Sequence, residues 1–258
     1  MGVLESFSLD GKIALVTGGA GYYGRQIVEA IAEAGSTTIT ASRSLDAQQA
    51  LAQKLCARGL AVEPAQYDQA EEESIIRLRD HILDRHGRID ILVNNSVLRP
   101  MKGRRSREDW EQSMKVNATG IYLMCEYFAD PMKEQRSGSI INISSIYGMV
   151  GPDLTLYEGL PGVWVVPDYY FHKGGLINYS RYLASVLGPY GVRVNAISPG
   201  GYFSNQPRPF VERYEASTLL ERMANDTDLK GAIVFLASEA SAYVTGVNLP
   251  VDGGRTAK

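Results

Sequence analysis

Cysteine is scarce in this chain, with two residues among 258, and histidine occurs three times. Cys56 and Cys125 stand in separate segments with helical patterns, so they provide neither a disulfide framework nor a cysteine-rich metal site. His81 and His86 lie five residues apart, which does not place two imidazoles on one helix face as a spacing of three or four would. We therefore expect no metal site, a reducing compartment and two thiols that are at least half-buried.

Long hydrophobic runs are also missing. No stretch of about 18 consecutive apolar residues occurs, and residues Met1–Asp10 have neither the basic start nor the apolar centre of a signal peptide. The formal net charge of -3 and the pI near 5.7 argue against a nucleic-acid-binding surface. These absences predict a cytoplasmic protein that acts on a small molecule, with no membrane or nucleic-acid partner.

The chain does have enough apolar content to bury one substantial core. It is 45% hydrophobic over 258 residues, and no internal repeat or low-complexity tract interrupts it. Apolar segments typical of strands alternate with helical patterns from Lys12 to Val251. This alternation predicts one α/β domain, residues 1–258, built on a doubly wound parallel sheet of seven strands.

A glycine-rich turn follows the first predicted strand. Lys12–Thr17 is compact and apolar, and the stretch Gly18–Gly24 follows at once, before the helical pattern that begins at Ile27. Glycines let the backbone approach a pyrophosphate closely, and a helix N-terminus adds free N–H groups and a positive dipole end. The placement predicts a dinucleotide site, with an ordinary turn at a helix start as the alternative.

The residues after the second strand bear on the choice of cofactor. Thr37–Ala41 ends at Ser42, Arg43 and Ser44, where nicotinamide enzymes often carry an acidic residue for the ribose hydroxyls. Arg43 offers instead a guanidinium that pairs with a 2′-phosphate, which favours NADP over NAD while leaving NAD open. The alternative is a solvated arginine beside a helix that Ser44 caps.

Polar residues also follow the next two strands. The strand at 61–67 ends at Asp68, which is predicted at the adenine edge of the cofactor, at the N-cap of the next helix, or both. Ile89–Val93 ends at Asn94, Asn95 and Ser96, whose short side chains can tie neighbouring loops to the cofactor edge.

A basic loop follows, and it contains no acid between Arg99 and Arg107. Loops at the carboxyl ends of parallel strands border the ligand crevice, so some of these bases can attract an anionic substrate. The alternative is a solvated run of charge. The five basic residues are Arg99, Lys102, Arg104, Arg105 and Arg107.

A phenol and an ammonium group share one face of a later predicted helix. Tyr169 and Lys173 are four residues apart in a helical pattern that continues to Val186. A neighbouring cation lowers the pKa of a phenol, which would let Tyr169 exchange a proton with a substrate hydroxyl or carbonyl. Ser145, after the strand that begins at Ile140, can hold the same substrate oxygen. Spacing alone also fits an exposed pair without chemistry.

Together these motifs resemble the short-chain dehydrogenase/reductase family over nearly the whole chain. The resemblance implies a Rossmann fold and hydride transfer between a nicotinamide cofactor and a secondary alcohol or ketone. It rests on the order and spacing of Thr17–Gly24, Asp68, Asn94–Ser96, Asn117, Ser145, Tyr169 with Lys173, Pro199–Gly200 and Val251–Gly254.

The resemblance also implies roles for the matched residues. Tyr169 is the general acid/base, and Lys173 lowers its pKa and binds the nicotinamide ribose. Ser145 polarises the substrate oxygen, while Asn117, within the predicted helix at 108–133, holds a water that links Lys173 to solvent; exposure is its plain alternative. Ser144 fits the catalytic hydroxyl less well. The implied cofactor contacts are Gly18, Tyr22, Tyr23, Gly24, Ser42, Arg43, Asp68, Gln69, Asn95, Tyr169, Lys173, Pro199, Gly200 and Ser204.

The chain departs from the family pattern at three places. Tyr22 replaces the middle glycine of the turn, so its ring must avoid or cover the pyrophosphate. Ser96 and Val97 replace a usual alanine and glycine. The interval from Ser145 to Tyr169 is 24 residues, longer than in most members, and this insert, 147–168, must border the substrate.

The insert is similar to that of a bacterial branch linked to sugar metabolism and surface-glycan synthesis. Tyr147, Tyr157 and Trp164 suit stacking on a sugar ring. The alternative is an insert that only packs on a neighbouring subunit. We expect the segment 201–224 to form a lid. The expected substrate is a sugar, sugar acid or polyol. Two other functions remain as alternatives: a 3-oxoacyl-type ketone reductase and a non-catalytic NAD(P)-binding regulator.

Family members often form tetramers through helices at 108–133 and 169–187, which implies a homo-oligomer, tetramer or dimer.

Overall fold

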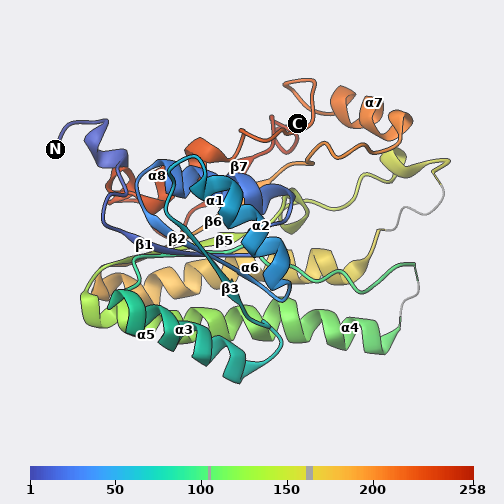
Figure 1. Ribbon diagram of the computed structural model, residues 1–258. Helices are drawn as coiled ribbons and strands as arrows, with labels where there is room; N and C mark the ends of the chain where they lie inside the picture. The colour runs from blue at the N-terminus through green and yellow to red at the C-terminus, as the bar shows by residue number, and fades with distance from the viewer. Residues whose placement is uncertain (104–105, 161–164) are drawn as a thin grey trace.

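A parallel sheet of seven strands, in the order β3-β2-β1-β4-β5-β6-β7, forms the centre of the molecule (Figure 1). The computed structural model describes residues 1–103, 106–160 and 165–258. The predicted doubly wound sheet is confirmed. Its strands are β1 (Ile13–Thr17), β2 (Thr37–Ser42), β3 (Val62–Gln66), β4 (Ile91–Asn94), β5 (Gly138–Ile143), β6 (Val192–Pro199) and β7 (Asn248–Val251).

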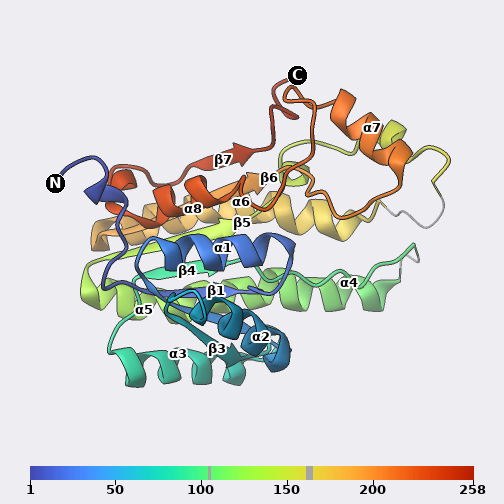
Figure 2. The same cartoon turned by 45° about the horizontal axis from the view of Figure 1, so that its top comes forward.

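Helices cover both faces of the sheet (Figures 1 and 2). The strand order reverses between β1 and β4, so the connections after β1 and β4 diverge and leave a crevice at the carboxyl ends of these strands. On one face lie α1 (Tyr22–Glu33), α2 (Leu45–Cys56) and α8 (Lys230–Ala237); on the other lie α3 (Glu72–His86), α4 (Arg107–Met114), α5 (Ile121–Gln135) and α6 (Pro167–Leu187).

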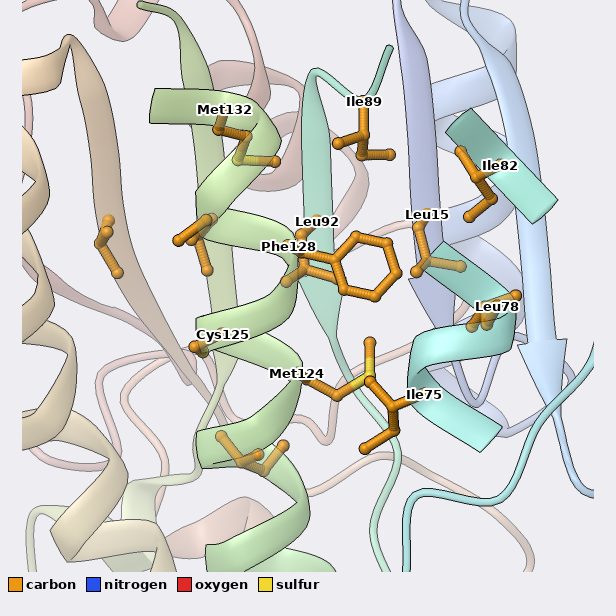
Figure 3. Packing of buried hydrophobic residues seen from close by; sticks show 14 of the residues in the cluster. Leu15, Ile75, Leu78, Ile82, Ile89, Leu92, Met124, Cys125, Phe128 and Met132 are labelled. Carbon is orange, nitrogen blue, oxygen red and sulfur yellow. The ribbon is translucent and has the colours of Figure 1, made fainter. Parts of the chain in front are cut away.

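The two faces carry separate apolar cores because the central strands are buried on both sides. Phe128 of α5 is fully buried and points toward Leu15 of β1 and Leu92 of β4 (Figure 3). Burial of one such ring contributes about 2 to 3 kcal/mol relative to an exposed ring. The second core joins α1, α2 and α8 to the opposite side of the same strands. The sheet is therefore a rigid base for the loops at its carboxyl edge.

The predicted helix at 108–133 is interrupted. A π-helical turn, Lys115–Gly120, separates α4 from α5, and Asn117 within it is 4% exposed, so the alternative of a simply exposed asparagine is wrong. The backbone comes close to the β3–α3 loop there: a Cβ on Gly120 would meet the Gln69 carbonyl oxygen at 2.3 Å. Such single π turns often occur at functional sites.

The insert packs on the segment that was predicted as a lid. A short 3₁₀ turn, Leu154–Tyr157, lies against α7 (Arg208–Ala216) (Figure 2). Leu156, Val211, Tyr214 and Met223 form a small separate apolar cluster. The Arg213 guanidinium donates to the Glu158 carbonyl at 2.7 Å. Residues 161–164, which include Trp164, lie outside the described part of the chain.

Cys56 is exposed, which corrects the expectation of two half-buried thiols, whereas Cys125 is buried. Within the described residues, no helix combines the length and apolar character needed to cross a membrane.

Candidate active site

The glycine turn is fastened to the loop after β4. The Thr17 hydroxyl accepts from the backbone N–H groups of Asn95 and Ser96, both at 3.0 Å. The Asn95 side chain donates to the carbonyls of Thr17 and Gly18, also at 3.0 Å. Gly18 has a φ of +66°, a left-handed conformation that favours glycine. These bonds fix the backbone where β1 meets α1.

The turn also fits a phosphate-bearing cofactor. A Cβ on Gly24 would lie 2.1 Å from the Gly18 carbonyl oxygen, so α1 can start this close to the turn only without a side chain. Tyr22, at the family's middle glycine, is 59% exposed and stacks on Tyr202 with ring centroids 5.3 Å apart. Because the Tyr22 ring packs on Tyr202, we expect the backbone N–H groups at the start of α1 to stay available for an anion.

Tyr23 links this turn to the end of β6. Its hydroxyl donates to the Gly200 carbonyl at 2.8 Å, directly after Pro199, and burial raises its pKa. Ser204 lies farther along the same segment, half-buried, where its N–H donates to Gln206 Oε1 at 2.8 Å. The structure therefore brings the predicted contacts from α1 and the β6 loop together.

Arg43 and Asp68 line one cavity of about 630 Å³ at the ends of β2 and β3. Arg43 is exposed, and Ser42 beside it accepts from Gln48 Nε2 at 2.8 Å. Asp68 Oδ1 accepts from Ala70 N–H at 2.9 Å in a local turn, whereas α3 starts at Glu72 with Glu71 at its N-cap. Asp68 is therefore not the N-cap of α3.

The Gln69 side chain is buried and hydrogen-bonded within the protein. It is 4% exposed, accepts from the Tyr67 hydroxyl at 2.8 Å, and donates to the Val116 carbonyl in the π turn at 2.8 Å. Its side chain thus connects the loop between β3 and α3 to the π turn that holds Asn117.

Ser145, Tyr169 and Lys173 meet at the carboxyl end of β5. Ser145 follows β5, and its hydroxyl lies near enough to the Tyr169 phenol to lower the pKa of that phenol. Lys173 is 5% exposed, donates from Nζ to the Ile143 carbonyl at 2.6 Å and lies 5.7 Å from the centroid of the Tyr169 ring. Ser144 points elsewhere, because its hydroxyl donates to the Lys173 carbonyl at 2.9 Å. The hydroxyl beside the phenol is that of Ser145.

The charges around Tyr169 determine its protonation. Burial raises the pKa of the phenol, but Lys173, Arg99 and the Ser145 hydroxyl together outweigh burial, and the net effect is a lowered pKa. Burial lowers the pKa of Lys173, an effect that the Tyr169 phenolate opposes and Arg99 adds to. The group that can exchange a proton is therefore Tyr169.

Arg99 is the residue that sequence reasoning did not single out. Its guanidinium carbon lies 4.4 Å from the centroid of the Tyr169 ring. The basic loop drew attention to this region, but no local pattern shows that its first arginine reaches a helix 70 residues later. Of the other bases, Arg107 pairs with Glu111 at 2.7 Å, while Arg104 and Arg105 lie outside the described residues.

Asn117 belongs to a buried polar network that ends at Asp168, the residue before Tyr169. Its side chain donates to the Leu98 carbonyl at 2.7 Å, accepts from Leu98 N–H at 2.9 Å and donates to the Ser113 hydroxyl at 3.0 Å. Ser113 in turn donates to Asp168 Oδ2 at 2.6 Å. Both N–H groups of the Asn117 amide are thus used, so contact with a water has to come from its backbone or from its carbonyl oxygen.

Aromatic hydroxyls line the approach from the insert. The hydroxyls of Tyr147 and Tyr157 are 2.9 Å apart, and the Tyr147 and Tyr170 rings pack with centroids 4.9 Å apart. Phe210 of α7 lies 5.5 Å from the Tyr157 ring. The insert, α6 and α7 thereby form one aromatic wall next to Ser145.

Comparison with known proteins agrees with this geometry. A family model described as enoyl-(acyl carrier protein) reductase matches residues 23–256. The 3-oxoacyl-(acyl-carrier-protein) reductase FabG of Aquifex aeolicus is 34% identical over 95% of this chain and 98% of its own length. The probable galactose dehydrogenase GalD of Rhizobium meliloti is 32% identical over 93% of each chain.

Solved structures agree as well. The crystal structure of a gluconate 5-dehydrogenase from Burkholderia cenocepacia, in complex with NADP and tartrate, superposes with a TM-score of 0.90 at 28% identity over the full length of both chains. Because the match spans nearly the whole chain in sequence and in structure, the chain is an NAD(P)-dependent oxidoreductase that acts on an alcohol or ketone, and it belongs to the short-chain dehydrogenase/reductase family.

Proposed function

We propose that this protein moves a hydride between a nicotinamide cofactor, preferably NADP, and a secondary alcohol or ketone of a sugar, sugar acid or polyol. The observation that carries the proposal is the Ser145–Tyr169–Lys173 arrangement, with a phenol whose pKa is lowered beside a hydroxyl at one strand end. The cofactor, when bound, supplies or accepts the hydride. The chain's own residues manage the proton and the substrate oxygen.

Tyr169 acts as the general acid/base. In reduction its hydroxyl donates a proton to the ketone oxygen, and in oxidation its phenolate accepts the proton of the alcohol. Ser145 donates a hydrogen bond to the same oxygen, which stabilises the negative charge that develops there. Lys173 keeps the phenol acidic. Oxidation should therefore rise with pH as Tyr169 deprotonates, and reduction should fall over the same range.

Asn117 would connect Lys173 to solvent through a water. Its position in a π turn supports this role, because the changed hydrogen-bond register there alters which backbone carbonyls are paired. The bonds to Leu98 and Ser113 hold the turn in one conformation.

Arg43 is the basis for preferring NADP. It is exposed, shares its cavity with Asp68, and pairs with no acid in the described chain, so its guanidinium is available for a 2′-phosphate. Gly18, Tyr22, Tyr23, Gly24, Ser42, Gln69, Asn95, Pro199, Gly200 and Ser204 complete the proposed cofactor site, several of them by shaping its backbone.

The aromatic wall supports a polar ring or polyol as substrate. Tyr147, Tyr157 and Tyr170 present ring faces and hydroxyls together, a combination that suits sugars. Relatives and neighbours with such substrates include the galactose dehydrogenase, a D-threitol dehydrogenase of Mycolicibacterium smegmatis and the gluconate 5-dehydrogenase. Reduction of a 3-oxoacyl chain is the second candidate, and the similarity to FabG favours it. Hydroxyls along the wall suit an acyl chain less well.

We also propose a cytoplasmic homo-oligomer, a tetramer or dimer. Tyr122 on α5 and Phe171, Tyr182 and Val186 on α6 are exposed large apolar side chains on neighbouring helices, and a second copy would cover them. A nicotinamide-dependent reaction also suits the cytoplasm, where this cofactor pool is maintained. The expected mass in light scattering is a multiple of 28.3 kDa.

The deciding experiment follows nicotinamide absorbance with NADP and NAD against sugars, sugar acids, polyols and 3-oxoacyl thioesters. Turnover of one polar class, lost in Tyr169→Phe, is the expected result. Turnover of acyl thioesters alone would favour the second candidate. Tight cofactor binding with no turnover on any class would leave the non-catalytic regulator.

A further inference from the structure

A second cation lies on the face of the Tyr169 ring. Lys173 approaches the ring from its own helix at 5.7 Å, and Arg99 lies closer, at 4.4 Å, from the loop after β4. Arg99 is an exposed residue, and none of the described acidic residues pairs with it. Lys173 alone does not offset the effect of burial, so Arg99 contributes to the lowered pKa of Tyr169. That contribution needs only the charge of Arg99, and the hydrogen-bond donors on its exposed side call for a further explanation.

The protein holds Arg99 in this position through its neighbour. Leu98 is bonded on both its N–H and its carbonyl by the Asn117 side chain, at 2.9 and 2.7 Å. Pro100 follows and restricts the backbone of Arg99 itself. A buried network thus anchors a short stretch whose next side chain reaches the reacting phenol. A basic loop that only faces solvent would not need its backbone to be fixed by buried hydrogen bonds.

We propose that Arg99 is a specificity residue that binds a carboxylate of the substrate beside the reacting carbon. The inference rests on the proposed function and names the substrate class within it, a sugar acid. A guanidinium has five N–H donors in a planar fork that matches a carboxylate. The guanidinium lies over the Tyr169 ring, and its exposed side leaves N–H donors for a carboxylate.

A bound carboxylate would also change the proton chemistry. Arg99 lowers the pKa of Tyr169, so an anion that neutralises Arg99 raises that pKa again. A sugar acid would then bind with the phenol more fully protonated, the form that donates to a ketone. The titratable or charged groups facing Tyr169 in the described chain are Lys173, His172, Tyr170, Arg99, Tyr147 and Tyr23.

The primary test is a titration that needs no turnover. The phenolate absorbance of wild type minus that of Tyr169→Phe isolates this one phenol. Gluconate or galactonate should move its midpoint to higher pH, whereas the matching polyols, sorbitol and galactitol, should not. In Arg99→Ala without ligand, the midpoint of the Tyr169 titration should lie at higher pH than in wild type, and gluconate should no longer shift it. Lys102→Ala removes a charge from the same loop and should behave as wild type.

Kinetics give the second arm. At the high-pH plateau, where Tyr169 is deprotonated in every variant, Arg99→Ala should lower kcat/KM for the acid about 10- to 100-fold and for the polyol less than about 3-fold. Arg99→Lys should keep the low midpoint but recover only part of the affinity. Equal responses to acids and polyols, or a gluconate response that survives in Arg99→Ala, would overturn the proposal. Failure of the proposed function looks different: no variant, wild type included, would turn over any substrate.

Discussion

The cofactor side and the substrate side of this crevice are built in different ways. On the cofactor side, most predicted contacts stand at a strand end or in the turn that follows it, and short bonds such as those of Thr17 and Asn95 join adjacent strand ends. On the substrate side, the basic loop, the insert and the 201–224 segment come from distant parts of the chain and meet through side chains. Strand ends can therefore be found in the sequence for the first side, whereas the contacts of the second side have no local sequence pattern.

The largest effect is expected at the point where the two sides meet. Tyr169→Phe removes the proton donor and should lower kcat by about 10²- to 10⁴-fold, while cofactor affinity, measured by quenching of intrinsic fluorescence, changes little. Tyr243→Phe is the control, because it removes the hydroxyl of a fully exposed tyrosine that belongs to neither side of the site. A Tyr169→Phe enzyme with near-normal turnover would show that another group moves the proton.

On the cofactor side, Thr17→Val should cost stability as well as binding. The Thr17 side chain is fully buried and accepts from two backbone N–H groups, both of which would lose their partner. The free energy of unfolding should fall by about 2 to 4 kcal/mol in urea denaturation. Thr38→Val, equally buried but bonded only to Ser36 among the described residues, should cost less. Equal losses would mean that the glycine turn is held mainly by other contacts.

Arg43→Ala tests cofactor selection on the same side. Loss of charge-assisted bonds to a 2′-phosphate should lower the ratio of NADPH to NADH affinity by about 10- to 100-fold, measured by calorimetric titration. Lys54→Ala removes a positive charge from the end of α2 and serves as the control. An unchanged ratio in Arg43→Ala would place the selection elsewhere in the cavity.

The fold followed from the sequence because its signals are local. The strand and helix periods, the glycine turn and the Tyr169–Lys173 spacing each depend on a few neighbouring residues. The π turn was not predicted, because the contacts that accompany it, those of Gln69 with Val116 and Gly120, come from another loop. Similarly, the prediction that Asp68 is the N-cap of α3 was wrong. Asp68 bonds the Ala70 N–H in a local turn, and α3 begins later, with Glu71 at its N-cap.

The candidate site shows the same division. Ser145 was distinguished from Ser144 by family pattern alone, and the structure adds the reason: the Ser144 hydroxyl is used by the Lys173 carbonyl. Arg99 could not be identified in this way, because its partner is an aromatic face on a helix distant in sequence. Contacts of a charge with a ring face have no spacing rule, so only the tertiary structure shows them.

The smallest effect is expected where the substrate side is tied to the end of the chain. Arg255 pairs with Asp153 of the insert at 3.0 Å and lies 5.6 Å from the Tyr214 ring of α7, so it joins three segments. Arg255→Ala should raise KM a few-fold and speed proteolysis of the insert, while the free energy of unfolding changes by less than about 1 kcal/mol, because the pair is partly exposed. Arg208→Ala breaks a pair within α7 alone and should do neither. If both variants raise KM equally, the insert is held by its apolar cluster, and the substrate side is as locally built as the cofactor side.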